Sequence, residues 1–81
     1  MWTVYMVRCR DGSLYTGITN NLTKRVARHN AGSASAYTRA RRPVRLVYEE
    51  AQLDRRAALA REAALRRLPR AAKLALVREP A

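Results

Sequence analysis

The segment WTVYMVRCRDGSLYTGIT, residues 2–19, decides how this chain folds. Its two ends, Trp2–Cys9 and Leu14–Thr19, are rich in valine, tyrosine and threonine, a composition typical of β-strands. The Asp-Gly pair at positions 11 and 12 is a strong signal for a hairpin turn between them. The sequence therefore predicts an antiparallel hairpin. Gly17 is unexpected in its second strand, because glycine costs backbone entropy and contributes no side chain to packing.

The length of the turn decides which side chains share a face of the hairpin, because side chains alternate along a strand. A two-residue turn pairs Tyr5 with Ile18 and places Tyr5 and Tyr15 on opposite faces. A three-residue turn over residues 11–13 instead places Tyr5, Tyr15 and Gly17 on one face. Both turns are compatible with the sequence.

Cap and turn signals divide the rest of the chain into helices and one more strand. Asn20 and Asn21 are suitable N-caps, and Gly32 is a suitable stop, for a helix in which Arg25 and His29 share one flank. In the third strand, VRLVYEE, positions 44, 46 and 48 are expected on one face. The expected order within a single domain, 1–81, is strand (2–9), strand (14–19), helix (before Gly32), loop (33–43), strand (44–50), helix (55–68, capped by Asp54) and a short helix from Pro69.

The charge of the chain is strongly positive. Seventeen Lys or Arg against six Asp or Glu give a formal net charge of +11, and every basic residue except Lys24 and Lys73 is arginine. The arginine guanidinium makes forked contacts with phosphate that lysine cannot make. A nucleic-acid partner is therefore expected, the alternative being a solvated arginine-rich surface. The spread of basic residues from Arg8 to Arg78 argues against a basic helix lying on a membrane.

Cysteine content and hydropathy exclude several other classes of protein. The single Cys9 excludes an internal disulfide framework and a multi-cysteine zinc site, and it fits a reducing cytoplasm. No apolar run approaches ~18 residues, so no membrane span is expected. The amino terminus shows no basic and then apolar signal-peptide pattern. A cytoplasmic location is expected.

Glu62 is the first candidate for chemistry. At ~100° per residue, it lies on the arc of its helix that runs from Leu65 through Ala58 to Leu59, the side expected to pack. A salt bridge to Arg66, four residues on, would explain a carboxylate there. The alternative is an oxygen ligand for Mg²⁺, which needs only one or two carboxylates together with phosphate and water.

The other candidate side chains are ambiguous when each is taken alone. His29, the single histidine, is either a surface residue of its helix or a functional partner of Arg25. Tyr5 and Tyr15 are typical sheet residues. The segment before the third strand is a candidate nucleic-acid contact loop or a solvated basic turn, in which arginines would contact phosphate and an aromatic ring would stack on an unpaired base. Its residues are Tyr37, Arg39, Arg41 and Arg42.

Taken together, these residues resemble the GIY-YIG nuclease superfamily. The half-motifs Thr3-Val4-Tyr5 and Tyr15-Thr16-Gly17 are followed in order by Arg25, His29 and Glu62. The likeness covers essentially the whole chain and is greatest to the small standalone bacterial members. It implies an α+β fold with a small three-stranded antiparallel sheet flanked by three helices, in the order ββαβαα.

The resemblance also implies metal-dependent hydrolysis of phosphodiester bonds. Glu62 would hold one Mg²⁺ or Mn²⁺ ion. Arg25 would neutralise charge that builds on the phosphate. Tyr5 would orient and deprotonate the attacking water, with Tyr15 supporting it, and Gly17 would let substrate approach beside Tyr15.

Two residues compete for the role of general base. An ordinary tyrosine, with a pKa near 10, is only about one part in a thousand ionised at neutral pH, although Arg25 and a metal are expected to depress the pKa of Tyr5. His29, with a reference pKa near 6.5, is mostly neutral and accepts a proton more readily. The resemblance favours Tyr5 and the intrinsic pKa favours His29.

Three departures from the family pattern bear on rate and substrate range. The first half-motif lacks the Gly-Ile before its tyrosine. Ile18 stands where many relatives place a basic residue. Some relatives carry an asparagine in a late helix, whereas the last asparagine here is Asn30.

The sequence leads to three hypotheses about function. The first is a cytoplasmic bacterial endonuclease that acts on DNA with low sequence specificity and a preference for nicked, branched or damaged structures, as in repair or recombination. The second is a basic DNA- or RNA-binding module with the same fold and little or no catalysis. The third is an accessory nuclease that acts only within a complex, in which a protein partner supplies specificity.

Overall fold

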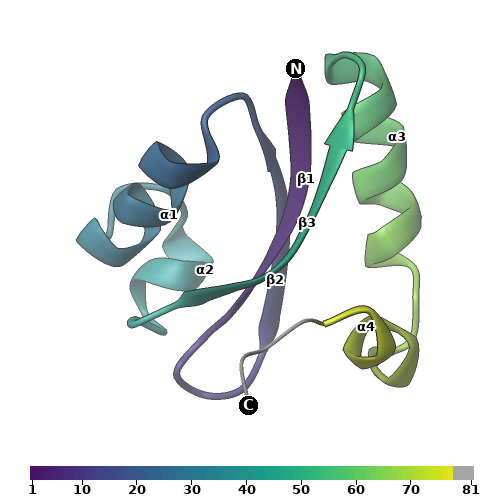
Figure 1. The fold of residues 1–81 in the computed structure, drawn as a ribbon. Helices are drawn as coiled ribbons and strands as arrows, with labels where there is room; N and C mark the ends of the chain where they lie inside the picture. Colours follow the sequence, from purple (N-terminus) through teal and green to yellow (C-terminus); the bar gives the residue numbers. More distant parts are fainter. Residues whose placement is uncertain (78–81) are drawn as a thin grey trace.

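A computed structural model describes residues 1–77 of the chain (Figure 1). Its elements are β1 (Trp2–Arg8), β2 (Leu14–Thr19), α1 (Leu22–Ala31), α2 (Ala36–Arg39), β3 (Arg45–Gln52), α3 (Arg55–Arg66) and α4 (Arg70–Leu76). The strands form one antiparallel sheet in the order β2-β1-β3. Helices α1 and α2 cover one side of this sheet, and α3 and α4 lie on the other (Figure 1). None of the described helices is long and apolar enough to cross a membrane.

The predicted α+β fold with the order ββαβαα is confirmed, with one addition. Segment 33–43, expected to be a loop, contains the four-residue helix α2. Ser35 is the N-cap of this helix, and its hydroxyl accepts a hydrogen bond from the backbone N–H of Thr38 at 3.1 Å. The Thr38 side chain is fully buried, so the short helix is part of the packed structure.

Side-chain caps set the boundaries of the longer helices, as the sequence predicts. Asn21 caps α1 by accepting a hydrogen bond from the N–H of Lys24 at 3.2 Å. Gly32 ends α1 in the left-handed region, with φ at 84°. Asp54 caps α3 through the N–H of Ala57 at 2.8 Å, although this helix ends at Arg66 rather than near Leu68.

The turn of the hairpin has an odd number of residues, but it lies one position earlier than the three-residue alternative. The Cys9 N–H donates to the Ser13 carbonyl at 2.9 Å, so the loop consists of residues 10–12, with Gly12 at φ 86°. Tyr5 therefore pairs with Gly17, and Val7 pairs with Tyr15. Tyr5, Tyr15 and Gly17 share one face, as an odd-length loop requires.

A β-bulge in β3 changes the predicted alternation of its side chains. Tyr48 pairs with Met6, but Leu46 already pairs with the next residue of β1, Val7, which leaves Val47 as the extra residue. Leu46 then packs on the α1 side of the sheet, whereas Tyr48 packs on the α3 side. The expectation that Tyr48 shares a face with Leu46 is therefore wrong, because a bulge shifts the two-residue period.

The sheet separates two small apolar clusters. Tyr5, Val7, Cys9 and Val44 are buried between the sheet and the segments on the α1 side. On the other side, Val4, Ala58 and Leu65 are buried, with partly buried neighbours that include Ile18 and Leu68. Adjacent residues of β1 thus supply both clusters, and β1 is the central strand because it pairs with both β2 and β3.

Gly17 is required by the ring of Tyr5. A Cβ atom at position 17 would lie 2.6 Å from the Tyr5 hydroxyl oxygen and 2.8 Å from Cζ, much closer than van der Waals contact. The open surface expected beside Tyr15 is therefore filled by the Tyr5 phenol, and Gly17 itself is buried. The structure contradicts a direct role for Gly17 in binding substrate and assigns it the role of making room for Tyr5.

We expect Gly17→Ala to destabilise the fold by about 1–3 kcal/mol, the usual cost of an overpacked core site. This exceeds the ~0.4–1 kcal/mol that a glycine-to-alanine change gains through the unfolded chain. Urea unfolding measures the difference. In a Tyr5→Leu background, which lacks the ring end, the cost of Gly17→Ala should largely disappear. An equal cost in both backgrounds would contradict this explanation.

Candidate active site

A buried chain of hydrogen bonds runs from β1 through α1 to α2. The Tyr5 hydroxyl lies 2.7 Å from Nε2 of His29, and Nδ1 of His29 lies 2.7 Å from Oγ1 of Thr38. The three side chains are 0%, 1% and 0% exposed, respectively. The Tyr5 and His29 rings meet edge to face, with centroids 5.8 Å apart. Both nitrogens of the single histidine are therefore engaged inside the protein.

Thr38 is held in place by the cap of α2. Its Oγ1 lies 2.8 Å from Oγ of Ser35 and 3.4 Å from the Ser35 carbonyl oxygen, to which it donates. With its own proton directed at Ser35, the Thr38 oxygen can accept a hydrogen bond from Nδ1–H of His29. The Nε2 lone pair then faces the Tyr5 hydroxyl. In this arrangement Tyr5 donates and His29 accepts.

Burial controls the protonation of this pair. It raises the pKa of Tyr5 to about 12, and the opposing effect of the nearby Arg25 guanidinium is smaller. Arg25 therefore lowers the pKa of Tyr5, as expected, but desolvation of the phenolate is the larger effect, and the net shift in the protein alone is upward. Burial, followed by the charge of Arg25, lowers the pKa of His29. Both residues are neutral at neutral pH.

The remaining predicted site residues approach the same phenol. The charge of Arg25 lowers the pKa of Tyr5, and the charges of Tyr15 and Glu62 act in the opposite direction. The Tyr15 ring meets His29 edge to face, with centroids 5.3 Å apart. Tyr15, Arg25 and Glu62 are only partly buried. The structure thus brings Tyr5, His29 and Tyr15 into direct contact, and the charges of Arg25 and Glu62 act on the same phenol.

Glu62 reaches this site from the opposite layer of the sheet. It lies on α3, whereas Arg25 and His29 lie on α1 (Figure 1). No ion pair joins Glu62 to Arg66 among the described residues, so the salt bridge that would have explained this carboxylate is not present. Glu62 remains available to a ligand.

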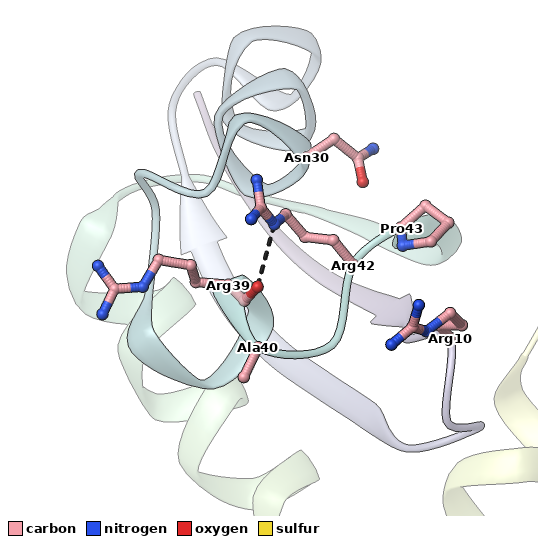
Figure 2. A pocket seen from close by; sticks show the side chains of 6 residues that line it. All are labelled: Arg10, Asn30, Arg39, Ala40, Arg42 and Pro43. Carbon is pink, nitrogen blue, oxygen red and sulfur yellow. Dashed lines mark hydrogen bonds between the residues drawn. The ribbon is translucent and has the colours of Figure 1, made fainter.

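The predicted contact loop divides into two parts with different roles. Tyr37 stacks on Tyr15, with ring centroids 5.9 Å apart and an interplanar angle of 27°. The guanidinium carbon of Arg41 lies 3.8 Å from the centre of the Tyr37 ring, and Arg41 is paired with Asp11 at 3.1 Å. Tyr37 and Arg41 therefore buttress Tyr15, in contrast to the loop in direct contact with nucleic acid that the sequence predicts. Arg39 and Arg42 line a separate pocket (Figure 2).

Sequence reasoning missed three residues that support the site. These are Ser35, Thr38 and Asp11, which act through His29 and Arg41. The Ser-x-x-Thr spacing of a helix cap was the available signal for the first two. For Asp11 the sequence indicated only a turn. Its contact with Arg41 spans 30 residues of sequence and has no local signal.

The donor set restricts which metals the site could hold. No group of three or more His, Cys, Asp or Glu side chains is positioned to hold an ion among residues 1–77. His29 uses both ring nitrogens internally, and Cys9 is buried. A single accessible carboxylate, Glu62, fits a hard cation such as Mg²⁺, which takes its other oxygens from phosphate and water.

The fold and this group of residues define a nuclease-type catalytic domain. A profile of the GIY-YIG catalytic domain matches residues 1–75, and the chain belongs to this family. Membership implies nucleic acid as the binding partner.

Similar proteins are small bacterial relatives of the same kind. The chain is 50% identical to a UPF0213 protein of Desulfotalea psychrophila over 95% of this chain and 71% of that protein. It is 46% identical to a UPF0213 protein of Staphylococcus haemolyticus over 94% and 93% of the two chains. The solution NMR structure of a UPF0213 protein from Bacillus halodurans superposes with a TM-score of 0.59 at 38% identity, covering 94% of this chain and 82% of that one.

We expect the pKa of His29 to lie below its usual 6.5, since burial and Arg25 both oppose the imidazolium. The imidazole proton of this single histidine can be titrated directly by NMR. In the Arg25→Gln variant, the pKa should move up towards the ordinary value.

The same shift makes stability depend on pH. Below pH ~6.5 the unfolded histidine takes up a proton that folded His29 does not, so the free energy of unfolding should fall as the solution is acidified through that range. A His29→Gln variant should lose this part of the pH dependence. An NMR titration midpoint of His29 at or above pH 6.5 would contradict both the lowered pKa and this pH dependence of stability.

Proposed function

We propose that this protein is a metal-dependent endonuclease that hydrolyses phosphodiester bonds in DNA with low sequence specificity. A preference for nicked, branched or damaged structures, as met in repair and recombination, is part of the proposal. The observation that carries it is the buried Tyr5–His29 hydrogen bond, on whose phenol the charges of Arg25 and Glu62 act. A structural core would not need a neutral acid–base pair next to a partly exposed arginine and carboxylate.

The pair resolves the competition between the two candidate bases, because it lets them act together. As water attacks phosphorus, its proton passes to the Tyr5 oxygen while the Tyr5 proton passes to Nε2 of His29. The new P–O bond forms as the bond to the leaving oxygen breaks, and His29 holds the proton. The 2.7 Å separation suits this transfer, and no free phenolate is required. Thr38 accepts from Nδ1–H and stabilises the imidazolium.

Arg25 controls access to this pair. Tyr5 is 0% exposed, and after burial the charge of Arg25 has the largest effect on the pKa of its phenol. A guanidinium drawn onto a phosphate would stabilise charge there and would at the same time uncover the Tyr5 hydroxyl. Catalytic hydrogen bonds often form fully only when substrate is bound, so burial in the protein alone is compatible with a catalytic role.

Glu62 would hold Mg²⁺ or Mn²⁺ at the same edge of the site. When bound there, the ion would polarise the scissile phosphate and neutralise charge on the leaving oxygen. The partial burial of Glu62 and the absence of an ion pair to Arg66 in the described part of the chain support this role.

A second candidate function follows from one observation, the complete burial of Tyr5. If Arg25 does not move, the pair is inaccessible to water, and the protein is a basic DNA- or RNA-binding module with little or no catalysis. The net charge of +11 serves either function, because phosphate contacts do not depend on base sequence.

Nicking of supercoiled plasmid in Mg²⁺ distinguishes the two functions. We expect Glu62→Ala to lower the nicking rate by on the order of 100-fold or more, since a catalytic metal contributes several kcal/mol. Glu49→Ala, which removes an exposed carboxylate of β3, is the matched control and should nick like the wild type. Equal rates for Glu62→Ala and wild type would overturn the role of Glu62. Retained DNA binding without any nicking by the wild type would support the binding module.

The pH dependence of nicking tests the proton path. Transfer through neutral His29 predicts a rate that rises through a pKa below 6.5 and is level from pH ~6.5 to ~9. A mechanism that needs free Tyr5 phenolate predicts instead about a tenfold rise per pH unit towards a pKa of about 12. Single-turnover rates at saturating DNA separate these outcomes. A rise of about tenfold per pH unit would contradict proton transfer from Tyr5 to His29.

A further inference from the structure

A basic pocket lies apart from the Tyr5 cluster, where the hairpin loop meets the segment before β3. It is a shallow pocket, largely open to solvent, with a volume of about 520 Å³, and it is lined by Arg10, Asn30, Arg39, Ala40, Arg42 and Pro43 (Figure 2). Three separate segments contribute its arginines: the hairpin loop, the end of α2 and the chain leading into β3. No acidic residue lines it. Of the residues that line the pocket, Arg39 and Arg42 were already predicted from the sequence to contact nucleic acid. Arg10 was not.

The walls of this pocket are held by specific hydrogen bonds. The Asn30 side-chain amide donates to the Val44 carbonyl at 3.0 Å, and its oxygen accepts from the Val44 N–H at 2.8 Å. The backbone N–H of Arg10 donates to the Arg41 carbonyl at 3.0 Å, which joins the hairpin loop to the opposite wall. The pocket is therefore a fixed feature of the fold, built by contacts between distant segments.

Arg42 is oriented within the pocket. Its Nε donates to the Arg39 carbonyl at 3.0 Å (Figure 2). A Cβ atom at position 32 would lie 2.8 Å from one terminal nitrogen of Arg42, so Gly32 makes room for the guanidinium as well as ending α1. The hydrogen bond from Nε thus fixes the orientation of the Arg42 side chain, which remains exposed to solvent.

The positive charge of the pocket is not neutralised by the protein. The guanidinium groups of Arg10 and Arg39 make no hydrogen bond or ion pair within residues 1–77. Arg41, close in sequence, provides the contrast, because it is paired with Asp11 and stacked on Tyr37. Like charges held together without a counter-charge are unfavourable unless an anion joins them.

We propose that this pocket binds a phosphate of the nucleic-acid backbone other than the scissile one. Arginine recognises phosphate by forked, charge-assisted hydrogen bonds. The lining contains no aromatic ring on which a base could stack, and its arginines are exposed, which suits a phosphate on an extended strand better than an enclosed nucleotide.

The position of the pocket links it to the catalytic centre. Asn30 follows His29 on α1, and Arg39 follows Thr38 on α2, so the two helices that hold His29 also carry the pocket. A strand held there would be anchored to the same rigid elements that position the Tyr5–His29 pair. The proposal rests on the proposed function only in taking the ligand to be the nucleic acid that the site cleaves.

The test is DNA binding without cleavage, measured on the full chain in EDTA. Fluorescence anisotropy with a labelled duplex, between ~50 and ~200 mM salt, gives Kd and its salt dependence. For Arg10→Ala/Arg39→Ala we expect about a tenfold weaker Kd and a log–log salt slope smaller by about 2, one for each lost phosphate contact. Neither side chain has a partner among the described residues, so the fold should persist, and thermal unfolding checks this.

The matched control removes the same charge from the opposite layer. Arg56→Ala/Arg67→Ala takes two exposed arginines from α3 and its C-cap. The control pair should change Kd and salt slope by clearly less. Equal losses of DNA affinity in the two double variants would show that only the total charge matters and would overturn the proposed phosphate site.

Two further measurements make this result independent of the nuclease proposal. If the wild type nicks DNA, the pocket variant should raise KM and leave kcat within about twofold, and a loss confined to kcat would contradict a binding role. If neither the wild type nor the variants nick DNA, a loss of DNA binding in the Arg10→Ala/Arg39→Ala variant but not in the control pair still supports the phosphate-binding pocket. Inorganic phosphate at millimolar concentration should compete poorly with the duplex. Complete competition with the duplex would assign the pocket to a free anion.

Discussion

The hydrogen bond between Tyr5 and His29 is the interaction on which the rest of the site depends. It forms because Gly17 leaves room for the phenol to extend across β2, and because the hairpin loop has an odd length that sets Tyr5 opposite this glycine. A side chain at position 17 or a turn one residue shorter would break the contact. One backbone register therefore connects the fold of the hairpin to the chemistry proposed for it.

Helix α2 shows how a short segment can support the candidate site without belonging to it. Its cap orders Thr38, which orients His29, and its Tyr37 stacks on Tyr15 under the guanidinium of Arg41. Most of these contacts are made by side chains at least half removed from water, so each loss would be felt at the site. The exposed arginines of the same region, Arg39 and Arg42, line a separate pocket, and this divides the basic segment into a part that supports Tyr15 and a part that faces solvent.

Burial, more than charge, sets the protonation of the pair. In a chain with a net charge of +11, the charges alone would favour a phenolate at Tyr5. Desolvation outweighs them and raises the pKa of Tyr5 to about 12, while it lowers that of His29. Both side chains are therefore held neutral in the protein, because an isolated buried charge on either would be costly.

The sequence by itself determined the order of the strands and the longer helices and the caps of those helices, because strand composition, capping and turn chemistry are local signals. The five candidate site residues came from the resemblance of their order and spacing to a known family, since each was ambiguous when taken alone. Tertiary structure decided what those signals could not. It selected the turn length and placed the bulge in β3, which moved Tyr48 to the other face. It also paired Arg41 with Asp11 across 30 residues and brought Arg10 beside Arg42. These outcomes depend on packing between segments distant in sequence, where the choice of partner depends on the whole fold.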